Sequence, residues 1–130
     1  MGSLPRAPRK FPHADPFQMS QYEIGLEGER KAARYLRKRG FQLQKQRFKS
    51  RHGEIDLIAK KGNHLYFIEV KHRPNARLGE GLQTITQDKR RRLLEAARAY
   101  LSNKPASWHL AYIEITRAGI LLYEDVLHEQ

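Results

Sequence analysis

The sequence contains no cysteine and no apolar run that approaches the length of a membrane span. Without cysteine the chain has neither disulfide bonds nor thiolate metal ligands. A transmembrane helix needs about 20 consecutive apolar residues, and the N-terminus also lacks the apolar core of a signal peptide. We therefore expect no membrane association and a cytoplasmic location.

Several catalytic signatures are also missing. The six histidines show neither H-x-x-x-H nor H-E-x-x-H spacing, so a zinc site is not expected. The chain has no G-x-S-x-G elbow and no phosphate-binding P-loop, which leaves acyl transfer and nucleotide hydrolysis without support.

Positive charge is abundant. The 130 residues include 25 Lys and Arg against 14 Asp and Glu, a formal net charge of +11. Such an excess favours an anionic partner, and nucleic acid is the leading candidate because neutralised phosphates release counterions. Basicity that serves only solubility, or association with ribosomes, is the alternative.

The length predicts one folded domain. Four of the six prolines lie within residues 1–19, together with three basic residues and few aliphatic ones. Proline fixes φ and removes a donor, so we predict a flexible basic arm over 1–19. It can touch nucleic acid or serve as a plain tail. Residues 20–130 are then a single domain.

The pattern of apolar residues predicts an α/β domain in the order α-β-β-β-α-β-β. Ser20 and Glu23 form a capping-box pattern at the start of the first helix. A second helix begins at Thr84 or Thr86 and ends at Leu101. The expected helices are 20–39 and 84–101, and the expected strands are 41–48, 54–59, 65–71, 108–116 and 120–127.

The second and third strands form a predicted hairpin. Gly62-Asn63 between two alternating runs is typical of a two-residue turn. If Lys61 pairs with His64, this register places Asp56 opposite Glu69 and Glu54 opposite Lys71. Side chains alternate between the two faces of a strand. One face of the hairpin therefore carries Glu54, Asp56, Glu69 and Lys71, and the other face carries Ile55, Leu57, Ile68 and Val70.

Directly opposed carboxylates repel each other, so the pair Asp56 and Glu69 indicates a cation between them. Mg²⁺ commonly takes one or two carboxylates with water and substrate phosphate. Lys71 is close enough to orient or activate a water. The alternative is an ordinary solvated face on which Lys71 neutralises Glu54.

These residues carry a resemblance. Asp56 followed by Glu69-x-Lys71 resembles the PD-(D/E)xK nuclease superfamily. Over about residues 22–101 the chain resembles one branch, the YraN family of bacterial endonuclease-like proteins, akin to Holliday-junction resolvases. The matching blocks are Gly25-x-x-Gly28-Glu29-x-x-Ala32, Gly53-Glu54-Ile55-Asp56-Leu57-Ile58-Ala59 and Ile68-Glu69-Val70-Lys71-x-Arg73.

The resemblance implies a restriction-endonuclease-like αβββαβ core, with a mixed central sheet flanked by helices. It implies Mg²⁺- or Mn²⁺-dependent hydrolysis of DNA, including branched or otherwise structured DNA, by a monomer or homodimer. Asp56, Glu69 and the Val70 carbonyl would bind the metal and Lys71 would position water. Glu54 and Glu29 would assist, although Glu29 is equally well an ordinary exposed glutamate, with Glu27 as the fallback.

Two basic runs are candidates for phosphate contact. Four cations early in a helix oppose its dipole, so local stability does not explain Lys89, Arg90, Arg91 and Arg92. The predicted phosphate-contacting surface also includes Arg73, at the end of the third strand, and three alternate residues of the first strand, Lys45, Arg47 and Lys49. A solvated strand end explains the run on the first strand almost as well. A non-catalytic nucleic-acid-binding module of the same fold and a protein-docking adaptor are the alternative functions.

Overall fold

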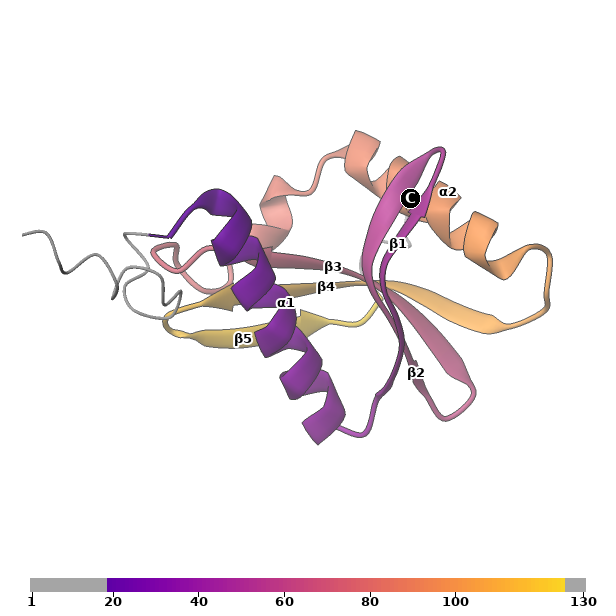
Figure 1. The fold of residues 1–130 in the computed structure, drawn as a ribbon, viewed down its shortest axis with the longest axis horizontal. Helices are drawn as coiled ribbons and strands as arrows, with labels where there is room; N and C mark the ends of the chain where they lie inside the picture. The colour runs from indigo at the N-terminus through magenta and orange to yellow at the C-terminus, as the bar shows by residue number, and fades with distance from the viewer. Residues whose placement is uncertain (1–18, 126–130) are drawn as a thin grey trace, which may run out of the picture.

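The computed structural model describes residues 19–125 as one mixed five-stranded sheet with a helix on each face (Figure 1). The predicted arm therefore lies outside the described residues, except for Met19. The elements are α1 (Gln21–Lys38), β1 (Gln42–Ser50), β2 (Gly53–Lys61), β3 (His64–His72), the 3₁₀ helix η3 (Gly81–Thr84), α2 (Gln87–Leu101), β4 (Ser107–Thr116) and β5 (Gly119–Tyr123).

The strands lie in the order β1-β2-β3-β4-β5. The pair β3–β4 is parallel, and the other neighbours are antiparallel. A parallel pair needs a crossover connection, which η3 and α2 provide here. The predicted α/β class and element order are confirmed, and the arrangement is consistent with a restriction-endonuclease-like core.

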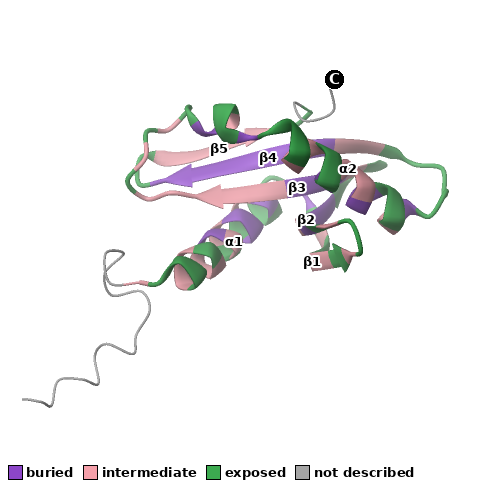
Figure 2. Cartoon of the chain, turned by 90° about the horizontal axis from the view of Figure 1, so that it is seen from above, coloured by how far each residue is buried: buried purple, intermediate pink, exposed green. Residues whose placement is uncertain are grey.

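Two apolar layers hold the helices to the sheet. On β4, Ala111, Ile113 and Ile115 pack with Ala32 and Leu36 of α1. Leu110 and Tyr112 face the other way and pack with α2. Because alternate residues of this strand feed opposite layers, β4 is buried along most of its length (Figure 2).

Helix α1 begins and packs as its sequence predicts. Ser20 is its N-cap, and the reciprocal bonds with Glu23 complete the predicted capping box. Gly28 is needed for close approach, since a Cβ there would come within 2.4 Å of the Cβ of His72 on β3. The Nδ1 of His72 also lies 2.8 Å from the Ile24 carbonyl oxygen. His72 is therefore a strand residue held by α1.

The turn between β2 and β3 contains the predicted Gly62-Asn63 pair. Gly62 has a φ of 61°, whereas Asn63 is not among the residues of positive φ. Positive φ at the first central position alone is the pattern of a type II′ turn. The last strand, expected over 120–127, ends at Tyr123, and residues 124–125 form a bend.

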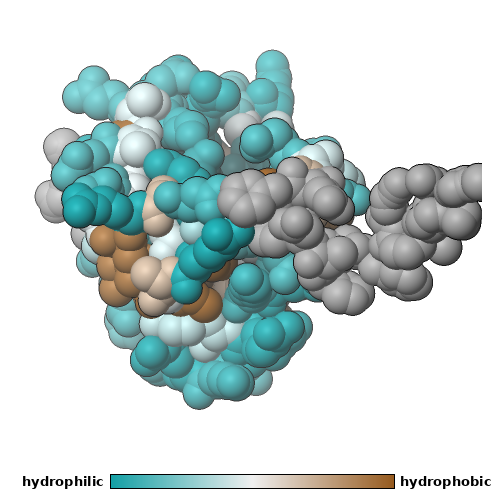
Figure 3. Space-filling model, turned by 90° about the vertical axis from the view of Figure 1, so that its left-hand side faces the viewer, coloured by the Kyte–Doolittle hydropathy of each residue, from teal (hydrophilic) through white to brown (hydrophobic). Residues whose placement is uncertain are grey.

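Neither helix of the described part is long and apolar enough to cross a membrane. The end of the molecule seen in Figure 3 is largely hydrophilic around one compact apolar patch. A surface of this kind is expected of a chain in which 30% of residues are charged.

Candidate functional site

The β2–β3 ladder matches the predicted register from the turn as far as Leu57 and Ile68, and it ends there. Asp56 and Glu69 are therefore not ladder partners, and neither are Glu54 and Lys71. The prediction of direct cross-strand opposition was wrong for these pairs. Beyond Leu57 the strand β2 remains paired only with β1, while β3 remains paired with β4 as far as His72. The hairpin is a fork, closed at its turn and open at Asp56.

A strained residue marks the point where the strands separate. Arg47 on β1 lies across from Asp56, between the pairs Gln46–Leu57 and Phe48–Ile55. Its φ is 53°, a left-handed conformation that costs a non-glycine residue about 1–2 kcal/mol. Such a residue within a strand redirects the chain, so β1 and β2 bend away from β3 together.

The bend also changes the faces of β2. Leu57 packs in the layer under α1, as do Ile68 and the half-buried Val70. Ile55 packs in the layer under α2. A regular strand would bury Ile55 and Leu57 on one face, and the sequence predicted this. The rotation of the strand at Asp56 explains the difference.

Asp56 projects into the gap between the separated strands. Its Oδ2 accepts a hydrogen bond from the Val70 N–H, with 2.8 Å between the atoms. The carboxylate thus takes the place of a backbone acceptor in the broken ladder. Burial and then the neighbouring Glu69 raise the pKa of Asp56 to about 7, although the bond from Val70 acts against this shift.

The open half of the fork lines a cavity of about 310 Å³. The structure brings to it the four charged residues that the sequence placed on one face, together with side chains of α2. Acidic groups and amines line the same cavity, which contains Glu54, Asp56, Glu69, Lys71, Lys89 and Arg92 beside Gly53 and Leu93. Gly53 is required where β2 meets α2, because a Cβ there would lie 2.8 Å from the Arg92 carbonyl oxygen.

Glu69 and Lys71 are each shifted toward their neutral forms. Burial raises the pKa of Glu69, and the nearby Lys71 and Lys89 counteract this rise. Burial and then Lys89 lower the pKa of Lys71, while Glu69 raises it. Two carboxyl groups with raised pKa values and an amine with a lowered one form a site poised for proton transfer or for an external ion.

The donor set suits a hard divalent cation, which would relieve the burial and repulsion that raise the pKa values of Asp56 and Glu69. The Val70 carbonyl leaves its strand on the same edge as the N–H that reaches Asp56, because paired strand residues exchange both bonds on one side. Within residues 19–125 no three acidic, His or Cys side chains gather to hold a metal. A cation would therefore need backbone and water oxygens as well, as Mg²⁺ commonly does.

Glu29 lies near this site but is not one of the residues that line the cavity. Its Oε1 is 2.9 Å from the Nε of Arg47, and its charge contributes to the raised pKa of Asp56. Glu29 thus ties α1 to the strained residue of β1. Glu27, the fallback, pairs with Arg30 at 2.7 Å and lines a different cavity from that of Asp56 and Glu69.

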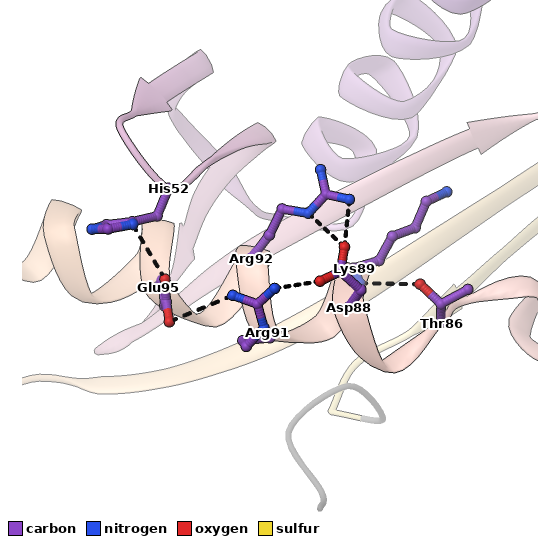
Figure 4. Close-up of polar contacts among 7 residues, drawn as sticks. All are labelled: His52, Thr86, Asp88, Lys89, Arg91, Arg92 and Glu95. Carbon is purple, nitrogen blue, oxygen red and sulfur yellow. Dashed lines mark hydrogen bonds and ion pairs between the residues drawn. The ribbon is translucent and has the colours of Figure 1, made fainter.

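The cations early in α2 differ in their surroundings, as Figure 4 shows for Lys89, Arg91 and Arg92. Arg91 and Arg92 converge on Asp88, and Arg92 does so through Nε at 3.0 Å and Nη2 at 2.6 Å. The side chain of Lys89 extends past this cluster, and Lys89 is among the residues that line the cavity. Arg90 is half-buried, and its Nε finds no partner within the described residues. These residues thus do not form one uniform basic face.

The other predicted phosphate contacts are scattered. Lys45 and Lys49 are exposed on β1, whereas Arg47 between them is engaged by Glu29. Arg73 follows β3, and its Nη2 donates to Thr84 Oγ1 at 2.6 Å. The structure therefore leaves Lys45 and Lys49 on the surface and gives Arg47 and Arg73 internal partners.

Glu114, for which the sequence alone predicted no role, is 2% exposed on β4 and lies beside Lys71 in the parallel ladder. Its Oε2 accepts from the N–H groups of Gly79 and Gly81, each at 3.1 Å. Gly81 has no room for a side chain, since a Cβ would lie 2.9 Å from the Glu114 carboxyl carbon. Glu114 thus anchors the connection from β3 to α2. The sequence did contain a sign of this role, because Glu114 is the one acidic residue on a largely apolar face of the predicted strand 108–116.

The chain is similar to proteins of one family. The model of the "Uncharacterised protein family UPF0102" matches residues 28–120, a segment that includes every cavity residue. A UPF0102 protein of Caldicellulosiruptor saccharolyticus is 36% identical over 109 residues, which are 84% of this chain and 92% of that protein. One of Hahella chejuensis is 43% identical over 82 residues, 63% of this chain and 66% of the relative. One of Chlorobium chlorochromatii is 43% identical over 83 residues, 64% of each. The match thus spans slightly less than two thirds of the last two relatives.

Proposed function

This chain belongs to the UPF0102 family, as its resemblance to YraN proteins predicted, and we propose that it is a metal-dependent endonuclease that hydrolyses DNA phosphodiester bonds. One observation carries the proposal. The β2–β3 fork opens at Asp56, and its open half brings Asp56, Glu69 and Lys71 to one cavity beside the basic helix α2.

Asp56, Glu69 and the Val70 carbonyl would hold Mg²⁺ or Mn²⁺ in this site. When bound, such an ion polarises a phosphate oxygen and lowers the pKa of water. Lys71 orients the attacking water by hydrogen bonding and offsets the charge that develops on phosphate. Its partly buried amine has a lowered pKa, so it can also accept a proton closer to neutral pH than an exposed lysine can.

The remaining acidic groups support these roles. Glu54 lines the cavity and is a further ligand or a hydrogen-bond partner of the ligands. Glu29 acts through its contact with Arg47, which fixes the bend that opens the fork. DNA is the proposed substrate because the chain carries a net charge of +11, and structured or branched DNA is favoured by the resemblance alone. The cytoplasmic location and the choice between monomer and homodimer stay predictions.

The test separates chemistry from binding. Wild type is incubated with branched, flapped, single-stranded and duplex DNA in Mg²⁺ or Mn²⁺, and the best substrate is kept. Lys71→Ala is expected to change DNA affinity by no more than a few fold, because Lys71 is one of 25 basic residues. It should lower the cleavage rate by about 10²–10⁴-fold, the usual effect of losing an acid–base group. Asp56→Asn should behave similarly.

Lys60→Ala is the matched control, since Lys60 is an exposed lysine of the same hairpin outside the cavity. If Lys71→Ala cuts as fast as Lys60→Ala, the measured activity comes from elsewhere. If wild type binds DNA and cuts nothing with either metal, the protein is a nucleic-acid-binding module and its charge cluster is structural.

A further inference from the structure

The cavity has two sides of opposite charge. Glu54, Asp56 and Glu69 come from the separated strands β2 and β3, whereas Lys89 and Arg92 come from α2. Lys71 lies on the strand side and lines the same cavity as Lys89. Just as neighbouring carboxylates indicate a cation, two amines that line one cavity indicate an anion that both can contact.

The α2 side contains two cations, and only one lacks a local counterion. Arg92 is held by Asp88 through two hydrogen bonds. Within residues 19–125 no ion pair engages Lys89, and its side chain extends away from the Asp88 cluster (Figure 4). Lys89 therefore lines the cavity without a local counterion in the described part of the chain, and its positive charge counteracts the rise that burial causes in the pKa of Glu69.

The position of Lys89 is fixed by the helix that carries it. Thr86 is the N-cap of α2, and its hydroxyl accepts from the Lys89 N–H at 3.1 Å. Close packing of Gly53 on the Arg92 carbonyl seats this turn of α2 against β2. A cation on a capped, packed helical turn loses less freedom on binding than one on a loop, which makes the site preorganised.

We propose that Lys89 and Lys71 form an anion subsite that binds the reacting phosphodiester group of the substrate, beside the carboxylates that would hold the metal. This rests on the proposed function and deepens it, because Lys89 becomes a catalytic residue that touches the reacting phosphate. The other basic residues of α2 contribute only to general attraction of the polyanion. Placing the phosphate between amines and a carboxylate-bound cation neutralises it from two sides.

The first experiment does not require nuclease activity. Inorganic phosphate is titrated into the metal-free full chain while backbone amide signals are followed by NMR. Wild type should show saturable shifts around Lys89 and the end of β3. Lys89→Gln should weaken this binding at least five-fold, and Lys89→Arg should restore most of it. Arg98→Gln is the matched control, since it removes one exposed charge from the same helix and should bind like wild type.

The second experiment measures cleavage at saturating DNA with a metal present. Lys89→Gln should lower kcat by about 10²-fold, the usual loss when one charge-stabilising donor is removed, with DNA affinity within a few fold. Thermal melting of each variant checks that it is folded. The subsite is refuted if Lys89→Gln binds phosphate like Arg98→Gln and cuts at the wild-type kcat.

The two ideas fail differently. If wild type cuts no DNA yet binds phosphate through Lys89, the anion subsite stands and the endonuclease proposal falls. If wild type cuts DNA and Lys89→Gln is indistinguishable from Arg98→Gln in both assays, the endonuclease proposal stands and the subsite falls.

Discussion

The two halves of the β2–β3 hairpin lie on the same pair of strands but differ in how these strands pair. In the closed half, the five residues from Leu57 to Lys61 pair with those from Ile68 to His64, and most of the apolar ones are buried. In the open half, Asp56 and Val70 are joined by a side chain instead of a backbone bond. In a continuous ladder the backbone N–H and C=O groups hydrogen-bond to each other, so none of them is free to bind a ligand. An interrupted ladder leaves a carboxylate and a carbonyl directed into one gap.

The difference in electrostatics follows from this geometry. The closed half buries aliphatic and aromatic groups, whose transfer from water is favourable. The open half partly buries charged groups, whose transfer is costly unless they are paired. We therefore expect the closed half to stabilise the fold, whereas the partly buried charges of the open half lower its stability and serve the proposed function.

The largest effect on stability is expected in the closed half. Phe67 is fully buried and makes edge contacts with Tyr100 and Trp108, at ring-centroid distances of 5.8 and 6.1 Å. Phe67→Ala should lower the free energy of unfolding by about 3–5 kcal/mol, the usual cost of such a cavity. Urea unfolding measures it. A loss below about 1 kcal/mol would contradict the assignment of stability to this half.

In the open half, a substitution should stabilise the metal-free protein. Burial raises the pKa of Asp56 from 3.8 to about 7. Between these values the folded state keeps a proton that the unfolded state has lost, so the free energy of unfolding falls as pH rises. Each pKa unit corresponds to about 1.4 kcal/mol, which gives a cost of roughly 4 kcal/mol above pH 7. Asp56→Asn should remove this cost.

Urea unfolding in a chelator at pH 5 and pH 8 measures the effect as a difference between variants. Asp88→Asn serves as a control of opposite sign, because hydrogen bonds from Arg92 and Arg91 lower the pKa of Asp88. The stability that Asp88 contributes is present above its ordinary pKa of 3.8 and is lost only below it, so Asp88→Asn should destabilise the protein to a similar extent at pH 5 and pH 8. If Asp56→Asn has no more stability at pH 8 than wild type, the open half carries no electrostatic cost.

The smallest effect concerns DNA affinity. Lys49 lies opposite Glu54 in the open region and is exposed, whereas the exposed Lys60 belongs to the closed half. Lys49→Gln should weaken binding a few fold and reduce the salt slope by about 0.9, the value of one phosphate contact. Lys60→Gln should change neither. Fluorescence anisotropy over a range of salt concentrations tests this, and equal slopes for both variants would place DNA elsewhere.

The closed half of the hairpin was predictable because turn chemistry and alternation are local properties of the sequence. The fork was not, because it depends on contacts distant in sequence. Arg47 adopts its left-handed conformation on β1, and Gly53 packs on the carbonyl of Arg92 in α2. The alternation of side chains therefore predicted the wrong face for Ile55, although it correctly predicted that Asp56 and Glu69 lie at the same site.

The sequence shows where basic residues cluster, but it does not show which acidic side chains they contact in the fold. The run at the start of α2 was expected to contact phosphate as a unit. Asp88 stands three and four residues before Arg91 and Arg92, a spacing at which helical side chains meet, and it engages both. The position of Lys89 one turn after the apolar Ile85 indicates an inward direction, and the docking of α2 on β2 brings Lys89 to the cavity.

The anchoring of the β3–α2 connection by Glu114 has a consequence for the order in which the protein is made. All cavity residues lie between Gly53 and Leu93, so they leave the ribosome before Glu114. The buried carboxylate that receives Gly79 and Gly81 arrives only with β4. A nascent chain that ends before β4 therefore carries every reactive group while the support for α2 is still missing. Assembly of the site therefore requires that β4 has been synthesised.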